Sequence, residues 1–291
     1  MSEETELKTF IIDQLKDMAK TIVKNTEKNI KSRTNNPFNS ISDEVGKHMG
    51  LGRSFDSQLG TRLQKIALYL ARRKYGKENV PNIILMSSKN NQDIVNVVRI
   101  AYDLSPEFGM TQKVYWKEPG FDFKGVFTHE LIKLYKKDPS KFCIKNDSIH
   151  CTIDEILTIK NKINEIDENG NGIPVDLVFF DKKDNAHTFE LKAGGNLDTK
   201  NTKSNVSEVE NLKLIFKIFG NNESKFATCY NNNGEGNTPK GTIFNKLSSK
   251  EQAVGKNFWE EILPKSLTYD KFIQIYHKAF KEAKVEETIV K

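Results

Sequence analysis

The chain has 291 residues, of which 37% are hydrophobic, so it can build a core and wholesale disorder is excluded. The formal net charge of +6 permits a polyanionic partner without requiring one. Three cysteines are too few for a disulfide framework, and we find no membrane-spanning apolar run and no signal-peptide pattern. We therefore expect a soluble cytoplasmic protein.

The N-terminal part has the apolar spacing of long helices. Apolar residues recur every three or four positions over 5–31 and again over 57–74, which predicts two amphipathic helices. The apolar face of the first helix could lie on the protein's own core or form a dimer contact. Between the helices we expect a loop containing three glycines, Gly46, Gly50 and Gly52.

The next part of the chain is less regular. Residues 82–104 are compatible with strand or helix, and a further helix is predicted over 125–137. Thr152 followed by Glu155 is a capping-box pattern, so a helix is predicted over 153–166.

The pattern changes to strand after residue 172. Two β-rich segments, 173–180 and 186–193, flank a polar run, which predicts a hairpin. The elements expected after the hairpin are a polar stretch over 194–205, a helix over 206–219, a strand over 225–230 and helices near 250–262 and 268–284.

The hairpin carries Asp176 on its first strand and Glu190 and Lys192 on its second. Residues two apart on a strand share a face, so Glu190 and Lys192 point the same way. If the turn is symmetric about Lys183, Asp176 faces Glu190, and opposed carboxylates repel each other. A divalent cation removes that repulsion. Mg²⁺ suits such a site because it binds one or two carboxylates and keeps waters and phosphate oxygens as its other ligands.

This spacing is typical of the PD-(D/E)xK nuclease site, in which the lysine orients the attacking water or holds the phosphate. The same spacing also arises by chance on a solvated strand face, and it leaves both interpretations open. The apolar flanks of the hairpin favour charges lying beside a core, where functional groups are common.

A calcium loop overlaps the start of the hairpin. Asp167, Asn169, Asn171 and Gly172 match the first positions of an EF-hand, but its twelfth position, normally Glu, is Val178. We therefore expect a turn that leads into the strand.

Four segments carry a family resemblance. Their sequences are RSFDSQLG (53–60), FELKAGGNLDTKN (189–201), TCYNN (228–232) and VGKNFW (254–259), which continues to TY (268–269). In these segments the chain resembles the TdeIII/MjaII-type type II restriction endonucleases, in the same order and from about residue 37 to 280. The second segment is far more specific than the bare nuclease spacing.

The resemblance implies an α/β restriction-endonuclease-like PD-(D/E)xK core, in which helices flank a central mixed sheet. We expect a single domain over 1–291, mostly helical to about residue 137 and catalytic and DNA-contacting over about 138–291. The implied enzyme is a prokaryotic, Mg²⁺-dependent homodimer with a companion DNA methyltransferase. It would cut both strands of double-stranded DNA at a short, GC-containing interrupted palindrome such as GGNCC.

By motif position, Asp176 and Glu190 would bind the metal and Lys192 would be the catalytic lysine. Nucleases of this kind often carry a further glutamate on a helix before the hairpin. The resemblance places that residue at Gln64, which could still orient a metal-bound water, and Glu165 is a weaker substitute.

The polar stretch after the catalytic strand fits phosphate positioning, with base reading or a plain solvated loop as alternatives. The candidate DNA contacts there are Asn196, Lys200, Asn201, Lys203 and Asn205. All six arginines lie in the first 99 residues, and Arg53 is our candidate for reading guanine.

Two other functions remain open from the sequence. One is a structure-specific or repair nuclease with the same core. The other is a non-catalytic DNA-binding module that keeps the nuclease fold.

Overall fold

The computed structural model forms two compact units, one of residues 1–66 with 265–291 and one of residues 67–264. We call them the helical unit and the sheet unit. The boundary between them falls within a single helix, α2 (Asp43–Tyr75). The structure describes residues 2–34, 43–88, 92–103, 111–118, 126–194, 199–220 and 222–290.

The helical unit is built on α1 (Glu3–Thr34), which packs against α7 (Tyr269–Glu282) and α8 (Val285–Val290). The apolar stripe of α1 is at most 2% exposed, so it covers the core of its own unit rather than a dimer contact. The residues of this stripe are Leu7, Ile11, Leu15, Met18 and Ile22.

The loop predicted at Gly46, Gly50 and Gly52 is wrong, because α2 already begins at Asp43 and contains all three glycines. Each glycine costs a helix about 1 kcal/mol relative to alanine, which a long helix can absorb through its other contacts. Gly50 faces Thr26 of α1, where a Cβ would lie 3.9 Å from the threonine methyl group, so the two helices approach each other closely there.

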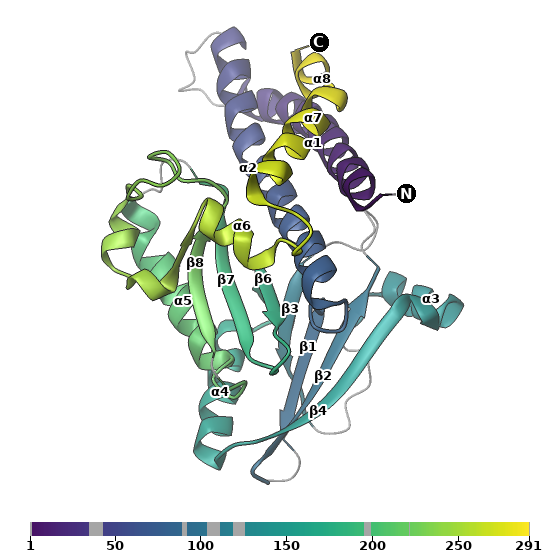
Figure 1. Cartoon of the computed structure of the whole chain (residues 1–291), viewed down its shortest axis with the longest axis vertical. Coiled ribbons are helices and arrows are strands. Elements are labelled where there is room, and N and C mark those ends of the chain that lie inside the picture. The colour runs from purple at the N-terminus through teal and green to yellow at the C-terminus, as the bar shows by residue number, and fades with distance from the viewer. Residues whose placement is uncertain are drawn as a thin grey trace. The chain divides into compact units, whose positions relative to one another are not determined.

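The sheet unit contains two mixed sheets, one with the strand order β4-β2-β1-β3-β5 and one with the order β6-β7-β8-β9 (Figure 1). The first sheet consists of β1 (Ile83–Ser88), β2 (Ile94–Tyr102), β3 (Gln112–Trp116), β4 (Phe142–His150) and β5 (Ile173–Val175). The second consists of β6 (Leu177–Phe180), β7 (Ala186–Lys192), β8 (Glu223–Thr228) and β9 (Gln252–Val254).

Helices flank these sheets, and α5 packs along β7 and β8 (Figure 1). The α-helices are α3 (His129–Lys137), α4 (Ile153–Ile166), α5 (Thr202–Ile215) and α6 (Lys256–Ile262). The short 3₁₀ helices are η3 (Pro139–Lys141), η4 (Thr199–Asn201), η5 (Thr242–Asn245) and η6 (Ser249–Glu251). The predicted α/β class, with mixed sheet flanked by helices and a helical N-terminal region, is confirmed.

Several predicted boundaries are wrong. The helical N-terminal part ends at Tyr75 rather than near residue 137, because β1, β2 and β3 follow it. Helix α5 begins at Thr202 and not at residue 206. The start of the helix expected near 250–262 is η6 followed by β9. The capping box of α4 is confirmed, since Thr152 and Glu155 each accept the other's backbone N–H.

The hairpin has the predicted register. Leu177 pairs with Phe189 and Phe180 with Ala186, so the turn is symmetric about Lys183. The carboxylate of Asp181 holds this turn by accepting the backbone N–H groups of Lys183 and Asn185.

The turn before β5 is not a calcium loop. Asp167 ends α4 and accepts the backbone N–H of Gly172 at 2.8 Å, and a strand follows where an EF-hand needs a helix. Gly172 has a φ of 83°, and a Cβ there would lie 2.4 Å from the ring of Tyr115, so only glycine fits.

The chain passes from the first sheet to the second at Asp176, between β5 and β6. The amide of Gln112, a β3 residue that is 1% exposed, bridges the sheets at this point. Its Oε1 accepts the N–H of Val178 at 2.8 Å, and its Nε2 donates to the carbonyls of Val178 and Pro81. One side chain thus replaces the backbone ladder that is interrupted at the switch.

We predict that Gln112→Met lowers the free energy of unfolding by about 3 kcal/mol, because it leaves three buried backbone groups without partners. Urea denaturation measures this loss. The matched control is Gln274→Met on the exposed face of α7, which should change stability by less than about 0.5 kcal/mol. Equal stability of the two variants would contradict the bridging role.

Candidate active site

Asp176, Glu190 and Lys192 come together at the start of the second sheet. Asp176 lies just beyond the last hairpin pair, and its Oδ2 accepts the backbone N–H of Leu191 at 2.8 Å. This bond places the aspartate between Glu190 and Lys192 along the strand. The Lys192 ammonium donates to the Glu190 carboxylate, so the two side chains share one face of β7, as predicted.

A fourth charged residue, Glu208 of α5, lies beside Glu190 and was missed from the sequence. Its Oε1 accepts the hydroxyl of Ser204, one helical turn earlier. Its Oε2 is buried and has no hydrogen-bond partner within the described part of the chain. The signal that could have found it is its position, three residues after the polar stretch and on the helix that follows the catalytic strand.

Burial and neighbouring charges shift the pKa values of Glu190 and Lys192. Burial, together with the neighbouring Asp176 charge, raises the pKa of Glu190 to about 8, and the contact with Glu208 acts in the same direction. Burial alone would lower the pKa of Lys192, but the charges of Glu190, Asp176 and Glu208 outweigh it and raise that pKa. Lys192 therefore stays protonated at neutral pH.

The donors present fit a magnesium ion. Asp176, Glu190 and Glu208 offer hard carboxylate oxygens, which Mg²⁺ prefers. Three carboxylates meet one ammonium here, and desolvation disfavours the excess negative charge, as the raised pKa of Glu190 indicates. The Oε2 atom of Glu208, which is buried and has no hydrogen-bond partner among the described residues, is a further oxygen that could bind the cation.

After β7 the chain passes close to the aromatic ring of Tyr230. Gly194 has a φ of 127°, and a Cβ there would lie 2.6 Å from the ring of Tyr230, so only glycine allows this approach. Tyr230 is 44% exposed and begins the loop after β8. The backbone N–H of Cys229 donates to the carbonyl of Lys192. This bond holds the C-terminal ends of β7 and β8 side by side.

The loop after Tyr230 is held by its own asparagines. The Nδ2 atoms of Asn231, Asn232 and Asn233 donate to the carbonyls of Asn237, Lys240 and Thr238 respectively. These amides are therefore engaged in the loop's own structure.

The predicted DNA-contacting residues differ in their exposure to solvent. Lys200 and Asn201 of η4 and Lys203 of α5 are exposed. Asn205 is buried, at 7% exposure, which argues against a direct DNA contact by its side chain. Asn196 lies outside the described residues.

Three of the six arginines have structural roles. Arg99 is 2% exposed and pairs with Asp147 and Asp184, while Arg72 donates to two backbone carbonyls and to the Asn82 side chain. Arg62 is 5% exposed and pairs with Asp17. Arg53 is exposed, as a base-reading residue must be.

The two further ligand candidates stay predictions. Gln64 is half-buried on α2 and belongs to the helical unit, whereas Asp176 and Glu190 belong to the sheet unit. Glu165 is exposed on α4, and its carboxylate pairs with Lys162 at 3.2 Å.

Comparison with known families gives a match to the model described as "Type II restriction endonuclease, HinfI", over residues 129–279. The match covers more than half of the chain and includes every carboxylate of the candidate site. The chain belongs to the HinfI family of type II restriction endonucleases. Neither the curated proteins nor the solved structures contain a match.

Membership of this family implies a site-specific nuclease that binds DNA, and enzymes of this kind typically use a divalent metal. The described residues also include a group of histidine and acidic side chains that could hold a metal ion. No described helix has the length and hydropathy needed to cross a membrane.

The raised pKa of Glu190 predicts that Mg²⁺ binding releases a proton at pH 7, because the carboxyl must ionise to bind the metal. Below pH 8 the Mg²⁺ affinity should rise with pH, by up to about tenfold per unit, and then level off. Without metal, stability should fall as the pH rises from about 4.5 to about 8 and then level off, since the folded state favours the protonated carboxyl.

Calorimetry in two buffers of different ionisation enthalpy counts the released proton. Glu190→Gln should lose both the release and most of the binding. The matched control Glu168→Gln, at an exposed position, should keep both. Binding by the unaltered protein without proton release at pH 7 would contradict the assignment.

Glu208→Gln is predicted to lower Mg²⁺ affinity and DNA cleavage by about 10- to 100-fold, because it removes one carboxylate from the group without removing its bulk. The control is Glu210→Gln, an exposed residue on the same helix, which should stay within about twofold. Equal affinities in the two variants would leave Glu208 without a part in the site.

Proposed function

We propose that this chain is a Mg²⁺-dependent type II restriction endonuclease of the PD-(D/E)xK type. The observation that carries the proposal is the partly buried group of Asp176, Glu190 and Lys192 on the β6–β7 hairpin, within a family of site-specific nucleases. The raised pKa of Glu190 supports it, because an isolated ion pair between Glu190 and Lys192 would lower that pKa.

In this proposal Asp176, Glu190 and Glu208 hold the metal. Bound Mg²⁺ would supply Lewis-acid stabilisation of the charge that develops on the scissile phosphate. Lys192, kept protonated by its carboxylate neighbours, holds a phosphate oxygen or orients the attacking water. The hydrogen bond from Leu191 keeps the Asp176 carboxylate turned toward the catalytic strand.

DNA would lie across the exits of β7 and β8. Lys200, Asn201 and Lys203 are exposed and follow β7 in sequence, and they would contact phosphates. Arg53 is proposed to read guanine through its exposed guanidinium, and Asn196 to contact DNA from the same polar stretch.

The finer assignment follows from the sequence resemblance. We propose a TdeIII/MjaII-type enzyme that acts as a homodimer on a short, GC-containing interrupted palindrome such as GGNCC. A palindrome has two-fold symmetry, which a symmetric dimer matches by placing one site on each strand. A companion methyltransferase would protect the same sites in a prokaryotic cytoplasm.

Lys192→Ala and Asp176→Ala are each predicted to lower cleavage of plasmid DNA at least about 100-fold while leaving the fold intact. The unaltered protein with Mg²⁺ should give discrete bands, whose ends give the recognition site. The control is Lys182→Ala, an exposed lysine in the turn of the same hairpin, which should keep full activity.

Other results would favour other functions. A smear or nicked plasmid would indicate a structure-specific or repair nuclease. Absence of Mg²⁺ binding would indicate a DNA-binding module without catalysis. Full activity of either site variant would remove this group from the reaction.

A further inference from the structure

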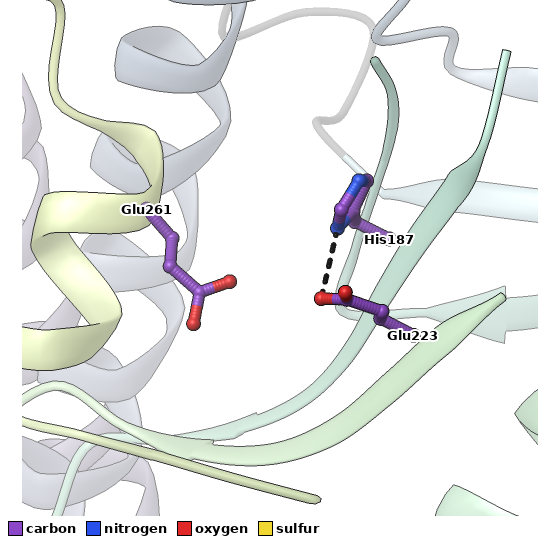
Figure 2. A group of neighbouring side chains, drawn as sticks. All are labelled: His187, Glu223 and Glu261. Carbon is purple, nitrogen blue, oxygen red and sulfur yellow. Dashed lines mark ion pairs between the residues drawn. The ribbon is translucent and has the colours of Figure 1, made fainter. Parts of the chain in front are cut away.

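A second cluster of ionisable side chains lies on the opposite face of the catalytic sheet. His187 on β7 pairs in register with Glu223 on β8, and Glu261 of α6 lies next to them (Figure 2). Their ligand atoms all lie within 4.8 Å of one another. Because side chains alternate along a strand, His187 points away from the face that carries Glu190 and Lys192. The cluster is therefore separate from the catalytic carboxylates.

The imidazole of His187 is held rigidly. Its ring stacks on Phe179 with a centroid distance of 4.8 Å, and its side chain is 17% exposed. Its Nε2 pairs with the Asp181 carboxylate at 3.5 Å. Asp181 has a pKa of about 2, because its hydrogen bonds from Asn185 and Lys183 outweigh the effect of burial, so it is ionised. This contact orients the imidazole so that its Nδ1 faces Glu223.

The Nδ1 atom of His187 faces the carboxylate of Glu223. The Nδ1 atom is buried without a hydrogen-bond partner in the described residues and lies 3.4 Å from Oε2 of Glu223. Figure 2 shows the Glu261 carboxylate directed toward this pair. These three side chains could together hold a metal ion. The arrangement of carboxylate, histidine and open nitrogen is the one in which proteins commonly orient a metal-binding histidine.

An ammonium already neutralises part of this charge. Lys225 lies 2.9 Å from Oε1 of Glu261 and 3.1 Å from Oε2 of Glu223. Asp181, Glu223 and Glu261 place three acidic side chains around His187 and this one ammonium. A divalent ion at the cluster would compete with the Lys225 ammonium for the two glutamates.

We propose that His187, Glu223 and Glu261 bind a divalent transition-metal ion, best Zn²⁺, which ties α6 to strands β7 and β8. Zinc accepts imidazole nitrogens and carboxylate oxygens, and an open zinc site has three protein ligands with water in the fourth position. Magnesium, which prefers an all-oxygen octahedral shell, suits this set poorly. The proposal does not depend on the nuclease activity.

The test is a calorimetric titration of the full chain with Zn²⁺ at pH 7. The unaltered protein should bind one more equivalent than His187→Gln or Glu223→Gln, or bind it about 10- to 100-fold more tightly. The matched controls His277→Gln and Glu260→Gln alter exposed residues and should bind as the unaltered protein does. Any Zn²⁺ bound by the catalytic carboxylates is common to all these variants and cancels in the comparison.

Lys225→Gln gives an independent test with the opposite sign. Removing the competing ammonium should tighten Zn²⁺ binding about tenfold, provided that circular dichroism shows the native fold. The site is overturned if His187→Gln and Glu223→Gln bind as much Zn²⁺ as the unaltered protein. It is also overturned if folded Lys225→Gln binds no more tightly, since the cluster would then be an ion-pair network around the lysine.

Discussion

The side-chain amide of Gln112 joins the two sheets at the one place where the chain crosses between them. A backbone ladder cannot continue through a switch of sheets, so the polar groups of Val178 would be buried without partners. A neutral amide offers both a donor and an acceptor, which allows one side chain to satisfy both groups. Asp176 lies two residues before this bridge, and its position is therefore fixed by the way the sheets are joined.

Strand β7 directs alternate side chains to opposite faces, which separates Glu190 and Lys192 from His187. Glu190 and Lys192 point to the face covered by α5, where Glu208 joins them. His187 and Phe189 point to the other face, where Phe189 packs against Phe258 of α6. A one-residue slip of β7 would exchange these two faces. The hairpin turn prevents such a slip, because Asp181 binds the backbone of the turn at two positions.

The features that the sequence predicted correctly depend on interactions between residues that are close together in the chain. The register of the hairpin follows from the symmetric polar turn at 181–185, and the capping box of α4 follows from Thr152 and Glu155. The common face of Glu190 and Lys192 follows from the period of a strand. By contrast, β9 has three residues, and it is a strand only because β8 lies beside it.

The parts that sequence could not predict depend on distant contacts. Helix α2 continues through its three glycines, which no local pattern records. Glu208 is one of many glutamates until α5 packs along β7 and brings it to Glu190. The sequence did not indicate a role for His187 because the two glutamates that lie next to it come from β8 and α6. Asn205 looked like a surface residue because its neighbours in sequence are polar, yet it lies on the buried face of α5.

The position of Asp176 at the crossing between sheets also governs when the protein becomes chemically competent. The aspartate is aligned only after β5 has joined the first sheet and β6 the second, and Glu208 arrives only with the docking of α5. A chain in which only one sheet has formed would therefore lack the assembled group of Asp176, Glu190 and Glu208.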